Sequence, residues 1–251
     1  MSKKKSIILT QRDQLILISL FKNKVLSLDQ VSKTFFTSSS RVAAAARMRA
    51  LNATGYISKR RFEIESKFQN IYEINEKGVQ TIQGELEGEV TSKNFKSDSV
   101  AHDLELFNIC ERIKAVPAIR RIITESELQS CGDCLENSDL RSFVQLRTDR
   151  FAELMDANKN TTLLSIEYER STKRRSQILR KLKDYYTHKK VKTVIYVCRT
   201  EPIKKVLMDA DLELRGNELS KMNFITLERF MTSSEKIIFE KINGSPLVLH
   251  N

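Results

Sequence analysis

The sequence predicts a protein of the α+β or α/β class with two domains: a small helical module ending in a two-stranded hairpin, then a mixed sheet flanked by helices. Its 251 residues exceed what one core usually serves. Glycine and proline are scarce, with 7 and 3 copies, which excludes a fibrous or disordered chain. We place the first domain at 1–84, a polar linker at 85–98 and the second domain at 99–251.

Composition narrows the class of partner. The net charge is +11, and residues 1–78 hold 15 Lys or Arg against 6 Asp or Glu, which favours a polyanion partner. Cys131 and Cys134 form a single CxxC without a second pair, so a zinc site is not predicted. No apolar run is long enough to span a bilayer and no signal peptide is recognised, so we expect a cytoplasmic protein without membrane insertion.

Three helices are predicted within the first 55 residues. Thr10 and Asp13 have the spacing of a capping box at the start of the first helix, and Ser27 begins a short second helix. The third helix begins at Arg41, contains four consecutive alanines and ends near Gly55, a residue suited to the left-handed conformation after a helix.

A basic hairpin follows the third helix. One strand begins at 56–57, the partner strand covers 70–74, and the tip lies near 65–67. This order resembles the winged helix-turn-helix of many bacterial DNA-binding proteins, with double-stranded DNA at a specific site as the implied partner. The serines at the helix start and the cations of helix and hairpin are the candidate contacts: Ser39, Ser40, Arg41, Arg47, Arg49, Lys59, Arg60, Arg61 and Lys67. A module used only for protein contacts stays open as an alternative.

The second domain begins with a helix from Ser99 whose apolar side includes Leu104 and Phe107. We expect Ser171 and Thr172 to cap a long basic helix. The other predicted elements are strands at 119–124, 143–146, 147–154, 162–170, 191–198 and 223–227 and a helix at 201–212. This order predicts a mixed sheet flanked by helices.

Three carboxylates are expected to meet at one end of this sheet. Glu167 and Glu169 are two residues apart on a strand and therefore share a face, and Asp149 lies across the hairpin from them. Because such a cluster is costly without a neutralising cation, and hard oxygen ligands select Mg²⁺ or Mn²⁺, these residues are the candidate metal ligands. Each could instead be a structural carboxylate, as a turn cap or a surface charge paired with arginine.

The second domain resembles the restriction-endonuclease-like PD-(D/E)XK fold. Asp149 occupies the Asp position and Glu167 the Asp/Glu position, and Glu105 corresponds to a further carboxylate on the first helix. The sequence departs from the pattern at Glu169, where a lysine is expected. The role of that lysine must pass to the following helix, where Lys173 and Lys181 are candidates, or be lost.

The combination of both domains resembles the MOBC-type plasmid relaxases and the broader replication-relaxation family. The residues that carry it are the winged module, the His102-Asp103-Leu104 helix, Asp149, 167–170 and the lysine-rich helix. The resemblance implies a metal-dependent, site-specific DNA nicking endonuclease at the transfer origin of a plasmid or mobile element. It adds His102 to the catalytic candidates, and an accessory mobilisation protein and a conjugative coupling protein to the partners. In this interpretation the basic helix, with Arg174 and Arg175, follows the DNA backbone.

Three other functions compete for the same residues. A tyrosine relaxase needs a histidine cluster around its metal, whereas His102, His188 and His250 are widely separated, so we reject that mechanism. A non-catalytic repressor or origin-binding accessory protein with a degenerate nuclease fold is the alternative that the lysine-to-Glu169 departure supports. A defence nuclease or transposition endonuclease would share the site and differ in target.

Overall fold

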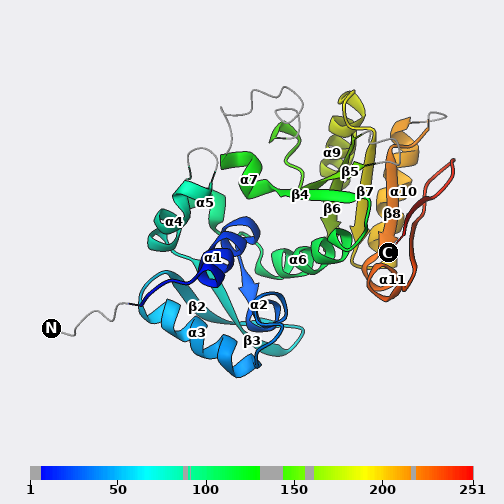
Figure 1. The fold of residues 1–251 in the computed structure, drawn as a ribbon. Coiled ribbons are helices and arrows are strands. Elements are labelled where there is room, and N and C mark those ends of the chain that lie inside the picture. Colours follow the sequence, from blue (N-terminus) through cyan, green and yellow to red (C-terminus); the bar gives the residue numbers. More distant parts are fainter. Residues whose placement is uncertain are drawn as a thin grey trace. The chain divides into compact units, whose positions relative to one another are not determined.

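The computed structural model describes residues 7–86, 90, 92–130, 144–155, 161–215 and 219–250 (Figure 1). They form two compact units. The first unit contains the described residues up to 107 together with 126–130, and the second contains 108–125 and the described residues from 144 onward. Each unit is described by itself below.

The first unit has the order of helices and strands that the sequence predicted for a winged helix-turn-helix. Its sheet has the order β1-β3-β2, with both pairs antiparallel. Its elements are α1 (Gln11–Asn23), β1 (Leu26–Ser27), α2 (Leu28–Phe35), α3 (Arg41–Ala53), β2 (Ile57–Ile64), β3 (Lys67–Ile74), α4 (Glu76–Ile82), the 3-10 helix η1 (Gln83–Glu85) and α5 (Ser92–Phe95).

Side-chain caps fix the predicted helix starts. Thr10 and Asp13 form the expected capping box on α1, and Ser27 forms another with Gln30 on α2. Ser40 caps α3 by accepting a hydrogen bond from the Ala43 N–H at 3.3 Å. The β2–β3 hairpin closes through a two-residue turn, 65–66, with both φ angles positive, as the twist of a tight hairpin requires.

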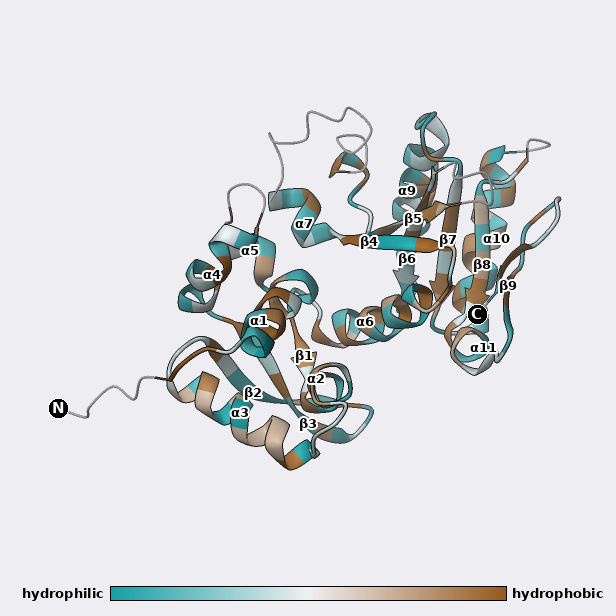
Figure 2. Ribbon diagram, viewed as in Figure 1, coloured by the Kyte–Doolittle hydropathy of each residue, from teal (hydrophilic) through white to brown (hydrophobic). Residues whose placement is uncertain are grey.

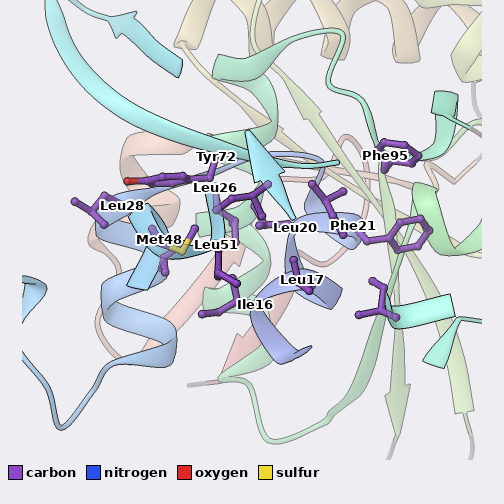
Figure 3. Packing of buried hydrophobic residues seen from close by; sticks show 14 of the residues in the cluster. Ile16, Leu17, Leu20, Phe21, Leu26, Leu28, Met48, Leu51, Tyr72 and Phe95 are labelled. Carbon is purple, nitrogen blue, oxygen red and sulfur yellow. The ribbon is translucent and has the colours of Figure 1, made fainter. Parts of the chain in front are cut away.

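The core of the first unit gathers side chains from α1, α3 and the sheet. Figure 3 shows Leu17 and Leu20 of α1 in the same cluster as Leu51 of α3 and Tyr72 of β3, all of them buried. Phe95 belongs to this cluster and is 4% exposed. The predicted linker at 85–98 is therefore wrong in this part, because α5 buries an aromatic side chain that a linker would expose.

Helix α6 (Val100–Lys114) continues through the division between the two units, which falls after Phe107. Its apolar residues match the predicted helix face, since Leu104, Phe107, Ile109 and Ile113 are all buried. The boundary between the compact units thus lies inside a helix and not in the polar segment before it.

The second unit is built on a five-stranded mixed sheet with the order β4-β5-β6-β7-β8. The strand pairs on the β4 side are antiparallel and those from β6 to β8 are parallel. Helix α10 contacts α9, β7 and β8, and Figure 2 shows β7 and β8 as mainly hydrophobic strands. The elements after α6 are β4 (Ile119–Thr124), α7 (Glu125–Ser130), β5 (Arg150–Met155), β6 (Thr161–Glu169), α9 (Arg175–Thr187), β7 (Thr193–Cys198), α10 (Glu201–Arg215), β8 (Met222–Thr226), α11 (Leu227–Thr232), β9 (Lys236–Phe239) and β10 (Leu247–His250). Of these, α7 belongs to the first unit from residue 126 onward.

Several local predictions in this unit need correction. The expected strand at 143–146 is wrong for 144–146, which are helical, and residue 143 lies outside the described residues. Ser171 and Thr172 do not cap the basic helix, because α9 starts at Arg175 and Arg174 is its N-cap. Helix α11 and strands β9 and β10 were not predicted from the sequence. Cys131, Cys134 and the turn at 156–160 lie outside the described residues.

Within the described ranges, no helix has both the length and the apolar character needed to cross a membrane.

Candidate active site and nucleic-acid interface

The second unit places two of the predicted carboxylates on one face of β6. Glu167 and Glu169 are two positions apart and are 5% and 9% exposed. In the parallel pairing with β7 they lie beside Tyr196 and Cys198. These carboxylates therefore stand near the carboxyl end of a central strand, in a largely buried position.

Asp149, which precedes β5, is hydrogen-bonded to the backbone of β6. Its Oδ2 accepts a hydrogen bond from the Tyr168 N–H at 2.8 Å, one residue from each glutamate. The negative charge of Asp149 also raises the pKa of Glu167. Asp149 thus lies immediately before β5 and beside β6, and at least two of the three predicted carboxylates interact electrostatically.

Lysine side chains neutralise the glutamates. Lys181 Nζ of α9 lies 3.1 Å from Glu167 Oε1 and donates to the Arg147 carbonyl oxygen at 2.8 Å. Lys173 Nζ lies 2.9 Å from Glu169 Oε2. The two candidates for the missing lysine are therefore both next to the carboxylates, although Lys181 is much the more enclosed, with 30% of its side chain exposed against 53%.

Burial and charge set the protonation of this pair. Burial raises the pKa of Glu167 to about 7, in spite of the opposing effect of Lys181. Burial lowers the pKa of Lys181, but the negative charges of Glu167 and Asp149 outweigh burial, and its pKa is raised above the ordinary value. Lys181 is consequently a cation at neutral pH, whereas Glu167 titrates near that pH.

Tyr185 is a member of this site that the sequence analysis missed. Its hydroxyl donates to Glu167 Oε1 and lies 2.9 Å from Thr148 Oγ1, and both side chains are fully buried. Burial, reinforced by the charge of Glu167, raises the pKa of Tyr185 well above its ordinary value. No sequence signal could show this contact, because it depends on how α9 lies on β6.

A cavity of about 470 Å³ opens beside these residues. Glu167, Glu169, Lys173 and Lys181 all line it, and Tyr196 and Leu207 contribute apolar surface. The site therefore combines acidic and basic groups in one hollow of the second unit.

Carboxylate oxygens are the donors that this site could offer to a divalent cation. Across the described ranges, no group of three or more His, Cys, Asp or Glu side chains is arranged to hold a metal. Two carboxylates on one strand face nevertheless direct oxygen donors to one cavity, and oxygen is the donor type that Mg²⁺ and Mn²⁺ prefer. The chemistry of the donors fits a hard cation, and Asp149 is a further carboxylate close enough to act electrostatically on Glu167.

The other predicted residues of the nuclease domain are not among the residues that line this cavity. His102 and Glu105 lie on the part of α6 that belongs to the first unit, so their catalytic role stays a prediction. His102 Nδ1 lies 3.2 Å from Asp103 Oδ1. Arg174 caps α9, and Arg175 forms an ion pair with Glu213 of α10.

In the first unit, the arginines of α3 differ in their surroundings. Arg41 Nε lies 2.6 Å from Asp29 Oδ1 and its side chain is 64% exposed. Arg47 points to the core side, where it binds the buried carboxylate of Asp13. Arg49 is exposed, with a backbone contact to Ala45 O at 3.4 Å. Ser39 and Ser40 lie at the start of the same helix, as predicted.

The hairpin carries exposed cations and one exposed aromatic ring. Lys59, Arg60, Arg61 and Lys67 are all exposed. Arg60 forms an ion pair with Glu73 at 2.7 Å, whereas the Arg61 guanidinium lies 4.7 Å from the centre of the Phe68 ring, which is 59% exposed. The predicted hairpin cations are thus accessible to a polyanion.

Comparisons with known proteins give a family match and a weak structural likeness. The solved structure of Bacillus subtilis PadR in complex with operator DNA is 16% identical over 53% of this chain and 79% of that chain, with a TM-score of 0.27, which is too low to support a shared fold. No curated protein matches the chain. The replication-relaxation family model matches residues 17–193, which include all of β6 and α9. The chain therefore belongs to the replication-relaxation family.

Proposed function

We propose that this protein is a metal-dependent endonuclease that nicks one strand of duplex DNA at the transfer origin of a plasmid or mobile element. The first unit selects the DNA site and the second unit cuts. The observation that carries the proposal is the set of Glu167, Glu169 and Lys181 around one cavity, with Asp149 fastened to the same strand. Membership of the replication-relaxation family supports a role in replication or mobilisation.

In this proposal Glu167 and Glu169 are the metal ligands, with Asp149 as the third. A divalent cation bound there would lower the pKa of a bound water and stabilise the departing oxygen. Lys181 would take the part of the lysine that is absent from β6: its ammonium donates to the Arg147 carbonyl oxygen and would bind a phosphate oxygen of the DNA. Tyr185 holds Glu167 in one orientation through its hydroxyl.

The test is nicking of supercoiled plasmid carrying the candidate origin, with Mg²⁺ or Mn²⁺ against chelator. We expect the protein to form open-circular product only when the metal is present. The nicking rate of Glu167→Gln should be at least about a hundredfold lower than that of wild type, which is the effect of removing one electrostatic group from a catalytic centre. Glu153→Gln is the matched control, because Glu153 lies on the neighbouring strand and pairs with Arg121 at 2.7 Å. Equal rates for Glu167→Gln and wild type would refute the metal site.

One observation favours a second function, a non-catalytic DNA-binding protein. Glu167 and Glu169 each have a lysine partner, and Tyr185 also donates to Glu167, so the cluster is neutralised without a metal. Such a protein would bind the origin as a repressor or accessory factor. The same assay separates the two: metal-independent binding with no nicked product from wild type supports this second function.

A further inference from the structure

The outward face of α3 carries a stripe that is mainly small and apolar. Ala44, Met48 and Leu51 face the core and are fully buried. On the opposite side of the helix, at spacings of three and four, lie exposed residues that share one stripe: Val42, Ala43, Ala46, Arg49 and Ala53. Val42 is 73% exposed, and Figure 2 shows the hydrophobic tint along α3.

Arg49 is the one polar side chain of this stripe. Arg41 is held by Asp29 and Arg47 by Asp13. Asn52 is exposed but follows Met48 by four positions, which places it next to the core face. Among the described residues of α3, Arg49 is thus the polar group best placed to meet a ligand along the stripe.

The charge around the stripe indicates what it contacts. Helix α3 contains three arginines and no acidic residue, and Ser40 caps its start. The neighbouring hairpin in the same unit adds exposed Lys59 and Arg61. An apolar stripe with a cationic surround is complementary to duplex DNA, in which methyl groups lie between two rows of phosphates.

We infer that α3 reads its DNA site through 5-methylpyrimidines: Val42 and Ala46 contact the methyl groups of thymine in the major groove, and Arg49 binds a guanine. The inference rests on the proposed DNA binding by the first unit. The thymine methyl is the apolar group that base pairs present in that groove, whereas adenine and cytosine are read by amide and carboxylate side chains. The stripe has no such side chain, so its specificity is for thymine and guanine.

The experiment uses the full chain and a duplex that it selects from a random-sequence pool at about 0.15 M salt. Each thymine of the selected site is then replaced by deoxyuridine, which removes the methyl and keeps base pairing. We expect about fourfold weaker binding for each thymine that faces the stripe, the amount corresponding to one buried methyl group. Replacing thymines outside the protected region should change nothing.

A mutant cycle assigns the contact to α3. Val42→Ala removes the methyl groups of Val42 that would contact one thymine. At that thymine position, replacement by deoxyuridine should therefore no longer weaken binding. Leu219→Ala is the matched control, because Leu219 is 76% exposed and belongs to the second unit. For Arg49→Met we expect roughly tenfold weaker binding or more, and no further loss when the contacted guanine is replaced by 7-deazaguanine.

The outcomes separate this inference from the proposed function. If the chain binds no duplex, the proposed function fails as well. If it binds duplexes without selecting a sequence, or binds deoxyuridine and thymine sites equally, DNA binding stands and methyl recognition is overturned. A chain that self-associates through α3, with Val42→Asp converting it to monomer, would also overturn the inference.

Discussion

Arg47 of α3 holds Asp13 of α1, with Arg47 Nε 2.7 Å from Asp13 Oδ1. The Asp13 side chain is 1% exposed and also accepts hydrogen bonds from Thr10, while Arg47 reaches the Ile8 carbonyl at 2.8 Å. From its place on the third helix, Arg47 is predicted to be a DNA contact. Its position gives it a structural role, which joins two helices of the winged module.

The first prediction concerns the stability of this module. Arg47→Ala should lower the free energy of unfolding by about 3 kcal/mol, because it leaves a buried carboxylate without its cation. Arg49→Ala, in the same helix but exposed, should stay within about 0.5 kcal/mol of wild type. Urea denaturation at neutral pH measures both, and equal losses would contradict the structural role of Arg47.

Acid should diminish the Arg47 effect. Burial raises the pKa of Asp13, but the hydrogen bonds from Arg47 and Thr10 outweigh it, and the pKa lies below its ordinary 3.8. A lowered folded-state pKa stabilises the protein above the ordinary value and loses that contribution as the pH falls through the folded value. The difference between wild type and Arg47→Ala should therefore shrink below pH 3.8, and a constant difference would refute the linkage.

The second prediction concerns Glu167, whose contribution to stability changes with pH in the opposite direction to that of Asp13. Its pKa rises from 4.5 to about 7 on folding, so the folded protein binds more protons than the unfolded chain in this interval. Glu167 should therefore cost about 3 kcal/mol of stability as the pH rises from 4.5 to 7. Glu167→Gln should lose less stability over this range than wild type and Glu153→Gln do. Three parallel denaturation profiles would contradict the raised pKa.

The sequence predicted what depends on local spacing. Period-two placement was sufficient for the shared face of Glu167 and Glu169, and the caps at Thr10 and Ser27 followed from side-chain types alone. Contacts between distant segments were not accessible to the same reasoning. Tyr185 reaches Glu167 across 18 positions and Arg47 reaches Asp13 across 34, so both depend on how a helix packs.

The third prediction tests a close approach in the first unit. A Cβ added to Gly78 of α4 would lie 2.4 Å from the Tyr56 carbonyl oxygen and 2.7 Å from Ile74 Cγ1. Gly78→Ala should therefore destabilise the protein by about 1–3 kcal/mol through overpacking. Gly84→Ala is the control, since nothing lies within 4 Å of its added Cβ. Equal melting temperatures for the two variants would contradict this packing.

The fourth prediction concerns the hairpin as a phosphate-binding element. Lys59 and Arg61 are exposed, and Arg61 is oriented by the Phe68 ring. Each cation that contacts a phosphate releases counterions on binding, so Lys59→Ala should reduce the slope of log affinity against log salt by about 0.9. Such a loss is expected to be uniform across DNA sequences, because phosphate contacts carry no base information. Lys236→Ala, an exposed lysine of β9 in the second unit, is the matched control. Titrations of labelled duplex at several salt concentrations measure the slopes, and an unchanged slope for Lys59→Ala would remove the hairpin from the DNA interface.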